Sequence, residues 1–326
     1  MPGKLLLPKT AEEEIQRLYW KVGLSTRKIA SKFGVSQTPV INFMRVYGIN
    51  RRSRILAVIA GCKKYDKPPF DGNLAEKAYL LGLALADFRR RRHGYQINIA
   101  LSTTHPTFAG LFKKLFEKYA PISERPLCDR KTGRCQWMLD TSLHPSFKFL
   151  LSPKEIPSWV ANDSNAFLNF LAGYFDGEGT ISISKSDEMY NTFIFQIASS
   201  DHKIIRGIAL ELKKRGFRIF FARTRLAGTL VKFDKITLRA NKDRWTVRVK
   251  RREEVLQLLK ILPIRHPEKI AKRELMFRLQ DKSYISDTAK KWGALRWRIK
   301  KDVEAYVLEA AARLSLNSFK SSSARA

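Results

Sequence analysis

The sequence is short of acidic side chains, and this shortage is its most informative feature. Its 326 residues include 30 Asp and Glu against 62 Lys and Arg, so the formal net charge is +32 at pH 7. This imbalance is too large for an ordinary cytosolic enzyme and indicates a polyanionic partner, with nucleic acid as the first candidate. A basic protein of ribosomal type is the plain alternative. A membrane surface is a weaker candidate, because no lipidation signal or long basic amphipathic helix stands out.

Cysteine is also scarce. The chain has three, Cys62, Cys128 and Cys135, and their spacing does not match a zinc site. An odd number without such spacing favours reduced thiols in a cytosolic compartment. Cys128 and Cys135 flank a short DRKTGR turn, so they could face each other across a hairpin.

Long hydrophobic runs are missing, although 44% of the residues are hydrophobic and suffice for a core. The most apolar run, AYLLGLALA at 78–86, lies between Lys77 and Asp87 and is far shorter than the ~20 residues that cross a bilayer. The N-terminal stretch MPGKLLLPKT has too few apolar residues for a signal peptide. We therefore expect no membrane contact, and a location in the cytoplasm (a prokaryotic nucleoid) or in an organelle rather than secretion.

Residues 1–50 are expected to form a small all-α domain. The periodicity predicts three short helices, in AEEEIQRLYWKVG, TRKIASKFG and QTPVINFMRVYG. Ala30, Gly34 and Val40 have the spacing of a helix-turn-helix, with a small residue at the helix contact, a glycine in the turn and an apolar anchor in the next helix.

The last of these helices would be the one that enters a DNA groove. Ser36 is expected to cap it and to lie with Gln37 and Thr38 at its groove-facing start. An ordinary three-helix bundle is the alternative, but the many surrounding cations favour DNA binding.

The rest of the chain divides by composition and by an internal repeat. Residues 51–73, from RRSR to KKYDKPPFDGN, have the composition of a basic linker. Residues 74–160 and 161–281 are each predicted to form a helix, two strands, a helix, two strands and a final helix. Residues 282–326 are expected to form a helical C-terminal extension.

Alternating apolar and polar residues predict the strands. YQINIALS would be the strand after the first apolar helix, and TISIS the strand after the second. KITLRANKDRWTVRVK predicts two strands joined by an Asn-Lys-Asp turn. The residues expected to point inward are Tyr95, Ile97, Ile99, Leu101, Ile181 and Ile183.

Two nonapeptides within the repeat correspond to each other: LLGLALADF at 80–88 and LAGYFDGEG at 171–179. Small residues recur in them four positions apart, and residues so spaced share one helix face. Two faces with so little bulk can cross backbone against backbone, which would bring the ends of the two helices together. The predicted helix-interface residues are Gly82, Ala86, Gly173 and Gly177.

Each of these helices ends in an acid, Asp87 in the first and Glu178 in the second. Adjacent carboxylates repel, and one of them would normally take up a proton. A hard, oxygen-binding divalent cation removes the repulsion, and Mg²⁺ (or Mn²⁺) suits two carboxylates. The paired acids therefore predict a shared metal site.

With two such nonapeptides, each followed by a strand, the chain resembles the LAGLIDADG homing endonucleases in their double-motif, single-chain form, over roughly residues 74–280. The resemblance implies an α+β fold: two pseudo-symmetric αββαββα halves forming a DNA-binding saddle of antiparallel strands, preceded by the small all-α helix-turn-helix domain. It also implies an intron-encoded, monomeric nuclease that hydrolyses phosphodiester bonds in both strands of a specific double-stranded DNA target with a divalent metal.

The resemblance assigns the metal ligands. Asp87 and Glu178 match the family's catalytic acid position, and the residues before them, Ala86 and Gly177, would contribute backbone carbonyls. Asp176, one helical step earlier, is interpreted as a structural or supporting residue.

Family members also hold basic residues near the reacting phosphates. Lys154 and Lys269 follow the last strands of the two halves and are the candidates, with solvated lysines as the alternative. Phe88 departs from the family's usual glycine, which affects the helix exit and not a metal ligand. The run RRRRH at 89–93 would contact backbone phosphates or form a solvated basic turn.

Polar residues on the outward faces of the predicted strands are the candidates for base recognition, since strands in a major groove can match side chains to base edges. If ~8 phosphates are contacted, the logarithm of the binding constant should fall with the logarithm of salt at a slope of about −7. The candidate residues are Gln96, Asn98, Ser182, Ser184, Arg239, Arg248 and Lys250.

Two other functions remain open on the same scaffold. A non-catalytic DNA-binding regulator is disfavoured because such proteins usually lose an acid, and here both are present. An RNA maturase, with a host intron RNA as its partner, stays open because a basic surface serves RNA as well as DNA.

Overall fold

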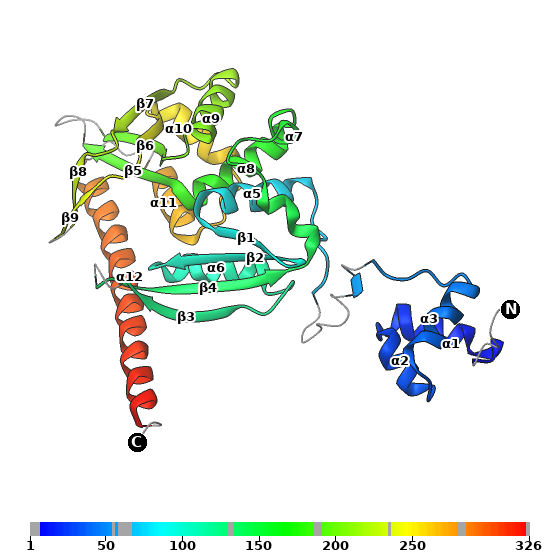
Figure 1. Ribbon diagram of the computed structural model, residues 1–326. Helices are drawn as coiled ribbons and strands as arrows, with labels where there is room; N and C mark the ends of the chain where they lie inside the picture. Colours follow the sequence, from blue (N-terminus) through cyan, green and yellow to red (C-terminus); the bar gives the residue numbers. More distant parts are fainter. Residues whose placement is uncertain are drawn as a thin grey trace. The chain divides into compact units, whose positions relative to one another are not determined.

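The computed structural model describes residues 7–53, 56–57, 67–129, 133–185, 191–233, 236–279 and 285–323 (Figure 1). The chain divides into two compact units, Met1–Lys67 and Pro68–Ala326, each with its own hydrophobic core. No helix within the described ranges is both long and apolar enough to cross a membrane.

The N-terminal unit holds the three helical segments that the sequence predicts. Ser25 caps the second by accepting a hydrogen bond from the backbone N–H of Lys28 at 3.2 Å. Gly34 makes the next turn at φ +64°, a conformation that glycine adopts readily, and Ala30 and Val40 are buried on either side. The elements are η1 (Lys9–Ala11), α1 (Glu12–Gln16), η2 (Arg17–Lys21), α2 (Thr26–Lys32) and α3 (Gln37–Val46).

The first half of the larger unit contains a four-stranded antiparallel sheet in the order β1-β2-β4-β3 (Figure 1). Its core face carries Ile97, Ile99 and Leu101, as predicted, and all three are buried. The elements are α5 (Leu74–Asp87), β1 (Arg89–His93), β2 (Gln96–Thr103), α6 (Pro106–Phe116), β3 (Ser123–Cys128), β4 (Cys135–Leu143), η3 (Pro145–Leu151) and α7 (Ser158–Ala161).

The second half repeats this plan, with the sheet order β5-β6-β10-β7. A separate hairpin, β8 with β9, is inserted between β7 and β10. The predicted α+β class and the paired αββαββα order are therefore confirmed. The elements are α8 (Ser164–Glu178), β5 (Gly179–Lys185), β6 (Asn191–Ser199), α9 (His202–Lys214), β7 (Phe220–Arg225), β8 (Leu230–Phe233), β9 (Ile236–Arg239), β10 (Arg244–Val249), α10 (Arg252–Ile261) and α11 (Pro267–Arg278).

One predicted strand was assigned to the wrong place. The strand that follows α5 is the basic run RRRRH, whereas QINIALST is the second strand of the sheet. Gly94, at φ +57°, lets the chain reverse between them, so that Arg91 lies opposite Asn98. RRRRH is therefore a cationic edge strand and not a solvated turn. Charged edges also discourage pairing with other chains.

The prediction that the two strands in KITLRANKDRWTVRVK pair with each other across a turn is also wrong. Both strands exist, but β9 pairs with β8, and β10 lies between β6 and β7. Val247 and Val249 are buried, which favours a central place for β10, whereas Leu238 and Arg239 of β9 are exposed.

Cys128 and Cys135 face each other across the β3–β4 hairpin, as the turn between them suggested, and a disulfide joins them. The expectation of reduced thiols is therefore wrong for this pair. Cys62 lies outside the described residues.

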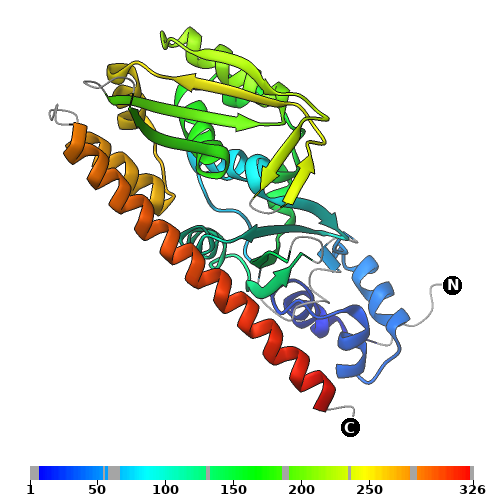
Figure 2. The ribbon, with the colours of Figure 1, turned by 90° about the vertical axis from the view of Figure 1, so that its left-hand side faces the viewer.

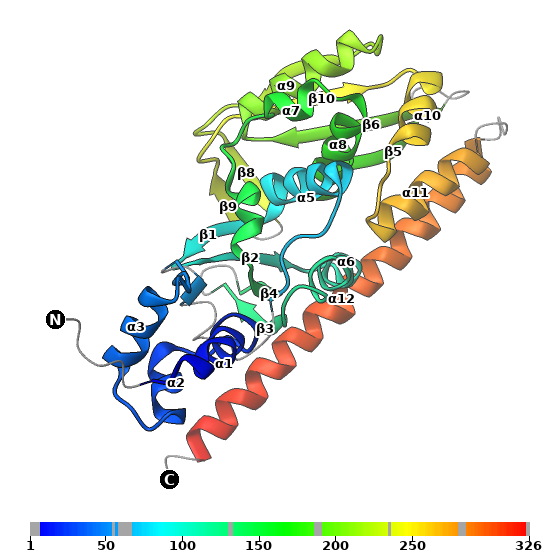
Figure 3. The same ribbon diagram turned by 90° about the vertical axis from the view of Figure 1, so that its right-hand side faces the viewer.

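Helices α5 and α8 lie side by side at the centre of the larger unit and make its most extensive contact (Figures 1 and 3). The long helix α12 (Ile285–Ser323) runs past α11, α6 and the β3–β4 edge of the first sheet (Figure 2). It is attached through Trp137, whose indole N–H donates to the Tyr306 carbonyl at 2.9 Å while the two rings stack at 5.3 Å.

Candidate active site

The crossing of α5 and α8 depends on two glycines. A Cβ on Gly82 would overlap the carbonyl oxygen of Phe170, and one on Gly173 would overlap the carbonyl oxygen of Tyr79. Both obstacles are backbone atoms of the opposite helix, which cannot rotate away as a side chain can. The two helices therefore touch backbone to backbone, as the small residues of the nonapeptides predict.

The same crossing brings together the ends of the two helices. A Cβ on Gly177 would lie 2.5 Å from the Cβ of Ala86 and 3.4 Å from the Cβ of Asp87. Asp87 and Glu178 are the last residues of α5 and α8. The structure thus brings the two predicted acids into one neighbourhood.

The two carboxylates influence each other. Burial raises the pKa of Glu178 to about 7, and the negative charge of Asp87 adds to this effect. Asp87 is solvent-exposed, yet the protein around it also raises its pKa by desolvation, against the opposing charges of Lys269 and His105. Both acids are therefore held where a negative charge is unfavourable.

Asp176 is a structural acid. It is 1% exposed, and its Oδ2 accepts hydrogen bonds from the Tyr79 hydroxyl at 2.7 Å and from the backbone N–H groups of Arg265 and His266 at 2.8 and 3.2 Å. Burial raises its pKa, and the Lys269 charge and these hydrogen bonds oppose the rise. Asp176 therefore ties α8 to α5 and to the segment before α11, and it leaves Glu178 as the acid at the helix end.

Lys269, on α11, reaches the end of α8. Its buried ammonium group donates to the carbonyl oxygens of Phe175 and of Asp176, the latter at 2.7 Å. A cation at a helix C-terminus is favourable because the last carbonyls lack helical partners. Burial nevertheless lowers the pKa of Lys269 to about 8, with the Asp176 charge acting in the opposite direction.

Asp87 and Lys269 line one depression of about 380 Å³ in the surface. Its wall is formed by residues from the end of β2 and from the start of α11, which belong to different halves. Ser102, at the end of β2, is among them. His105, His266 and Glu268 also line it.

Sequence reasoning missed the pair His105–Glu268 within this wall. The Glu268 carboxylate accepts hydrogen bonds from His105 Nδ1 at 2.9 Å and from the Thr107 hydroxyl at 2.7 Å. Burial acts to raise the pKa of Glu268, but these two hydrogen bonds, together with the charges of His105 and His266, lower the pKa to about 2. The sequence feature that could have drawn attention to this wall is a His-Pro dipeptide at the start of each of two helices, at His105 and at His266.

The surroundings of Glu178 differ from those of Asp87. The Ser199 hydroxyl lies 3.5 Å from Glu178 Oε1, and Asp201 adds a second negative charge that raises the pKa of Glu178. The Lys154 ammonium pairs with Asp201 at 2.7 Å, and its side chain is 54% exposed. The two predicted lysines are thus unequal, since only Lys269 lines the depression beside Asp87.

Most residues predicted to read bases lie on the strand faces away from the core. Gln96 and Asn98 share one face of β2, and Ser182 lies on the matching face of β5. Asn98 donates to the Ser142 hydroxyl at 3.2 Å, and Arg248 Nε donates to the side-chain amide oxygen of Gln196. Arg239 and Lys250 are exposed, and the side chain of Ser184 is not among those described.

In the N-terminal unit, the start of α3 carries the three predicted residues. Ser36 occupies the cap position, but its side chain makes no capping hydrogen bond, so the expected cap is wrong in this detail. Gln37 is engaged within the unit, since its amide donates to the Thr26 hydroxyl at 2.7 Å. Thr38 is exposed.

A metal at the helix ends would be held by few side chains. Among the described residues, no group of three or more His, Cys, Asp or Glu is arranged to hold a metal ion. The available donors are the carboxylates of Asp87 and Glu178 and the carbonyl oxygens of Ala86 and Gly177 in the last helical turns. Hard oxygen donors and mutually repelling carboxylates fit Mg²⁺ or Mn²⁺, with the remaining positions left for water and phosphate oxygens.

Comparison with known proteins finds similarity only among solved structures; no family model and no curated protein matches the chain. The homing endonuclease I-WcaI bound to its DNA recognition sequence is 13% identical, with a TM-score of 0.45 over 70% of this chain and 96% of that one. I-SmaMI bound to uncleaved DNA in the presence of calcium ions is 11% identical, with a TM-score of 0.38 over 67% and 97%. The N-terminal LAGLIDADG domain of DUF199/WhiA is 15% identical, with a TM-score of 0.37 over 62% and 89%.

Proposed function

We propose that this chain is a LAGLIDADG homing endonuclease that cuts both strands of a specific double-stranded DNA target with a divalent metal, Mg²⁺ or Mn²⁺. The observation that carries the proposal is the α5–α8 crossing. Two glycines place backbone against backbone, and the helices end in Asp87 and Glu178. Two ionised carboxylates that repel each other in a partly buried place destabilise the fold. A bound divalent cation would remove this repulsion, so the arrangement is explained by a metal site.

The protein's own groups would prepare the site in three ways. Asp87 and Glu178, with the carbonyls of Ala86 and Gly177, would hold the cation, which when bound supplies Lewis-acid activation of water and neutralises charge on the phosphate. Lys269 fixes the last carbonyls of α8 and keeps a positive charge next to Asp87. Glu268 holds the His105 ring in the wall of the depression that Asp87 lines, by accepting a hydrogen bond from its Nδ1.

Recognition of the target would use the outward strand faces and the cations beside them. The edge strand RRRRH borders one sheet, Arg248 lies on the other, and Lys250 follows directly after its strand β10. We infer that bases contact the polar side chains of β2, β5 and β10, and that the arginines and lysines neutralise phosphates.

The N-terminal unit would add a second DNA contact as a helix-turn-helix. Its buried Ala30 and Val40 flank the Gly34 turn with the spacing of that motif. Thr38 and Ser36 lie exposed at the start of α3, which would be the helix that enters the groove.

Plasmid cleavage tests this function. DNA carrying the target, selected from a randomised library by binding to the chain, should be cut in Mg²⁺ and left intact in EDTA. Asp87→Asn and Glu178→Gln should each abolish cleavage and keep target binding, because they remove a ligand charge without changing the shape of the site. Cleavage that persists in either variant would overturn the assignment of the acids.

The presence of both acids favours the nuclease over a DNA-binding regulator, and the same cleavage assay separates the two. A regulator would bind the selected target but leave it uncut under every metal condition. A maturase would be indicated by tighter binding to the transcript of the insertion locus than to its DNA.

A further inference from the structure

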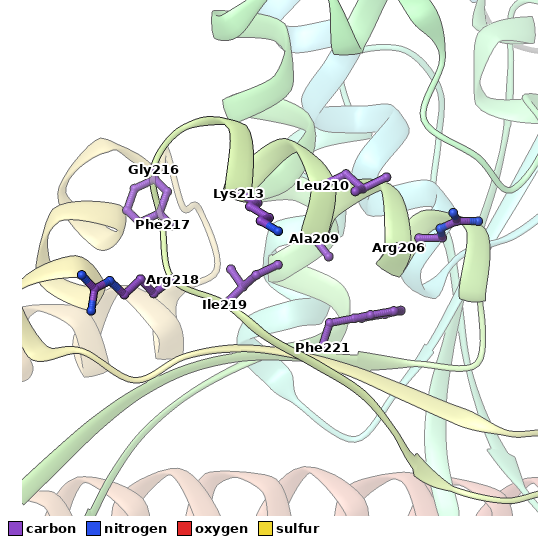
Figure 4. Close-up of a pocket in the computed structure, with 9 residues that line it drawn as sticks. All are labelled: Arg206, Ala209, Leu210, Lys213, Gly216, Phe217, Arg218, Ile219 and Phe221. Carbon is purple, nitrogen blue, oxygen red and sulfur yellow. The ribbon is translucent and has the colours of Figure 1, made fainter.

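A slot lies between α9 and the edge strand β7, and neither Asp87 nor Glu178 lines it. Its volume is about 670 Å³. In Figure 4 the Phe221 ring forms the foot of the slot, with Leu210 and Ala209 of α9 above it. Arg206 lies toward one end, Lys213 in the middle and Arg218 toward the other end.

The slot opens on the side of the sheet that faces α9, opposite to the strand face proposed for duplex DNA. Phe221 pairs with the buried Val247 in register, so both side chains point toward the core and α9. Phe220, the preceding residue, points the other way and lies 5.7 Å and 5.9 Å from the cationic groups of Arg248 and Lys250. A ligand in the slot would therefore not compete for space with a duplex on the strand face.

Flat aromatic rings continue from the foot of the slot. The Phe221 ring is stacked on Trp245 with centroids 5.5 Å apart and planes 17° apart. Trp245 in turn contacts the His202 ring, with centroids 4.2 Å apart. A planar ligand entering between α9 and Phe221 would extend this stack, and base–aromatic stacking is favourable for every nucleobase.

The rim of the slot is cationic. Arg206, Lys213 and Arg218 have no ion-pair partner within the part of the chain that the structure describes, and no acidic residue lines the slot. Unpaired cations around an apolar, aromatic floor match a ligand that has a flat ring and an anionic group. A nucleotide has both, but a duplex cannot insert its paired bases.

From this combination we propose that the slot binds a single-stranded segment of nucleic acid, with a base stacked on Phe221 and phosphates on Arg206 and Lys213. The chain would then have two nucleic-acid surfaces on opposite faces of one sheet. The proposal does not depend on cleavage, so it stands or falls separately from the nuclease.

The test is binding of a short fluorescein-labelled oligo-dT strand to the full-length protein in EDTA, in the presence of saturating unlabelled duplex. The strand should bind although the duplex face is filled. Phe221→Leu keeps the apolar volume and removes the aromatic face, so it should weaken strand binding roughly tenfold and leave duplex binding unchanged. Phe221→Tyr should restore strand binding. Cross-linking through 5-bromouracil should modify the peptide of residues 219–223.

Two neighbours supply matched controls. Phe220→Leu makes the same change on the opposite strand face and should leave strand binding unaltered. Lys214, next to Lys213 in α9, pairs with Glu211 and does not line the slot. Lys213→Ala should therefore weaken strand binding more than Lys214→Ala, although both remove one charge.

The proposal would be overturned if saturating duplex displaced the strand completely, or if Phe221→Leu bound it as tightly as the unchanged protein. Equal losses from Lys213→Ala and Lys214→Ala would show that only net charge matters. Tighter binding of an acidic peptide than of the strand would assign the slot to a protein partner instead.

Discussion

At the scale of single residues, the two acids at the ends of α5 and α8 impose a stability cost on the folded chain. Glu178 is half-buried beside Asp87, and its pKa of about 7 lies above the ordinary value of 4.5. The folded state therefore favours protonated Glu178. Its ionised form is unfavourable in the fold until a cation neutralises it.

Because of this cost, Glu178→Gln should increase the free energy of unfolding of the metal-free protein, by an amount that depends on pH. The penalty is absent below the unfolded pKa near 4.5, grows as the pH rises and is complete above pH 7, so the variant should unfold at higher temperature at pH 8. The gain is at most about 3 kcal/mol, since one pKa unit corresponds to ~1.4 kcal/mol. Thermal unfolding at pH 8 and pH 4 measures it.

The matched control is Glu117→Gln, which neutralises an exposed acid at the end of α6. It should change the melting temperature little at either pH. Equal stability of Glu178→Gln and the unchanged protein at pH 8 would mean that the two acids are well solvated and apart. Added Mg²⁺ should stabilise the unchanged protein and not the variant.

Glu268 should behave in the opposite way. Its pKa of about 2 is below the ordinary value, so its ionised form stabilises the fold above pH 4.5 and this contribution is lost as the pH falls toward 2. Glu268→Gln should therefore cost roughly 2 kcal/mol at pH 7, from weakened hydrogen bonds to His105 and Thr107. Chemical denaturation at pH 7 and pH 3 checks this; a deficit of the same size at both would refute it.

The residues of the site were predictable to different degrees. Asp87, Glu178 and the four small interface residues follow from one local pattern, because helix periodicity alone determines which face they share. His105 and Glu268 could not be paired from sequence, since each begins a helix in a different half and only the assembled fold joins them. Lys154 looked equivalent to Lys269, yet Asp201 holds it elsewhere.

At the scale of elements, the fold depends on how closely α5 and α8 approach. Gly82 and Gly173 each face a carbonyl oxygen of the opposite helix. Moving the helices apart to admit a methyl group would disturb both sheets and separate the acids.

Gly82→Ala should therefore destabilise the protein by roughly 3 kcal/mol or more, as overpacking against rigid atoms does. Gly110→Ala is the matched control: Gly110 is in the middle of α6, and a Cβ there meets nothing within 4 Å. That variant should be neutral or stabilised by up to ~1 kcal/mol, because alanine is the better helix former. Denaturant unfolding measures the free energy of unfolding of both variants. Similar values would contradict the close backbone contact between α5 and α8.

The elements that sequence analysis misplaced share a physical cause. RRRRH has no apolar alternation, so nothing local marks it as a strand; its pairing with β2 makes it one. β10 has clear alternation, but the choice of β6 and β7 over β9 as its partners depends on burial of the whole sheet. Local pattern therefore predicted which strands exist better than which strands pair.

At the scale of the whole molecule, the +32 charge should dominate binding to DNA. Contacts to ~8 phosphates predict a slope near −7 for the logarithm of the binding constant against the logarithm of salt. Removal of residues 1–67, which form a separate compact unit with its own core, should make this slope shallower and leave metal-dependent cleavage in place. Fluorescence anisotropy over a range of salt measures both slopes, and an unchanged slope would mean that the N-terminal unit does not contact DNA.

The larger unit also holds a feature that composition could not reveal. Residues 285–323 were expected to be helical, but only the fold places α12 against Trp137 and the β3–β4 edge. The pairing buries aromatic surface of two segments far apart in sequence, which no local pattern encodes.

The most direct measurement is anomalous diffraction from crystals of the full chain soaked in Mn²⁺. A peak bound by both Asp87 and Glu178 at the ends of α5 and α8 is the predicted result, and it should vanish in the Asp87→Asn, Glu178→Gln double variant. Peaks only at other places, or carboxylates directed to separate surfaces, would contradict the shared metal site on which the nuclease rests.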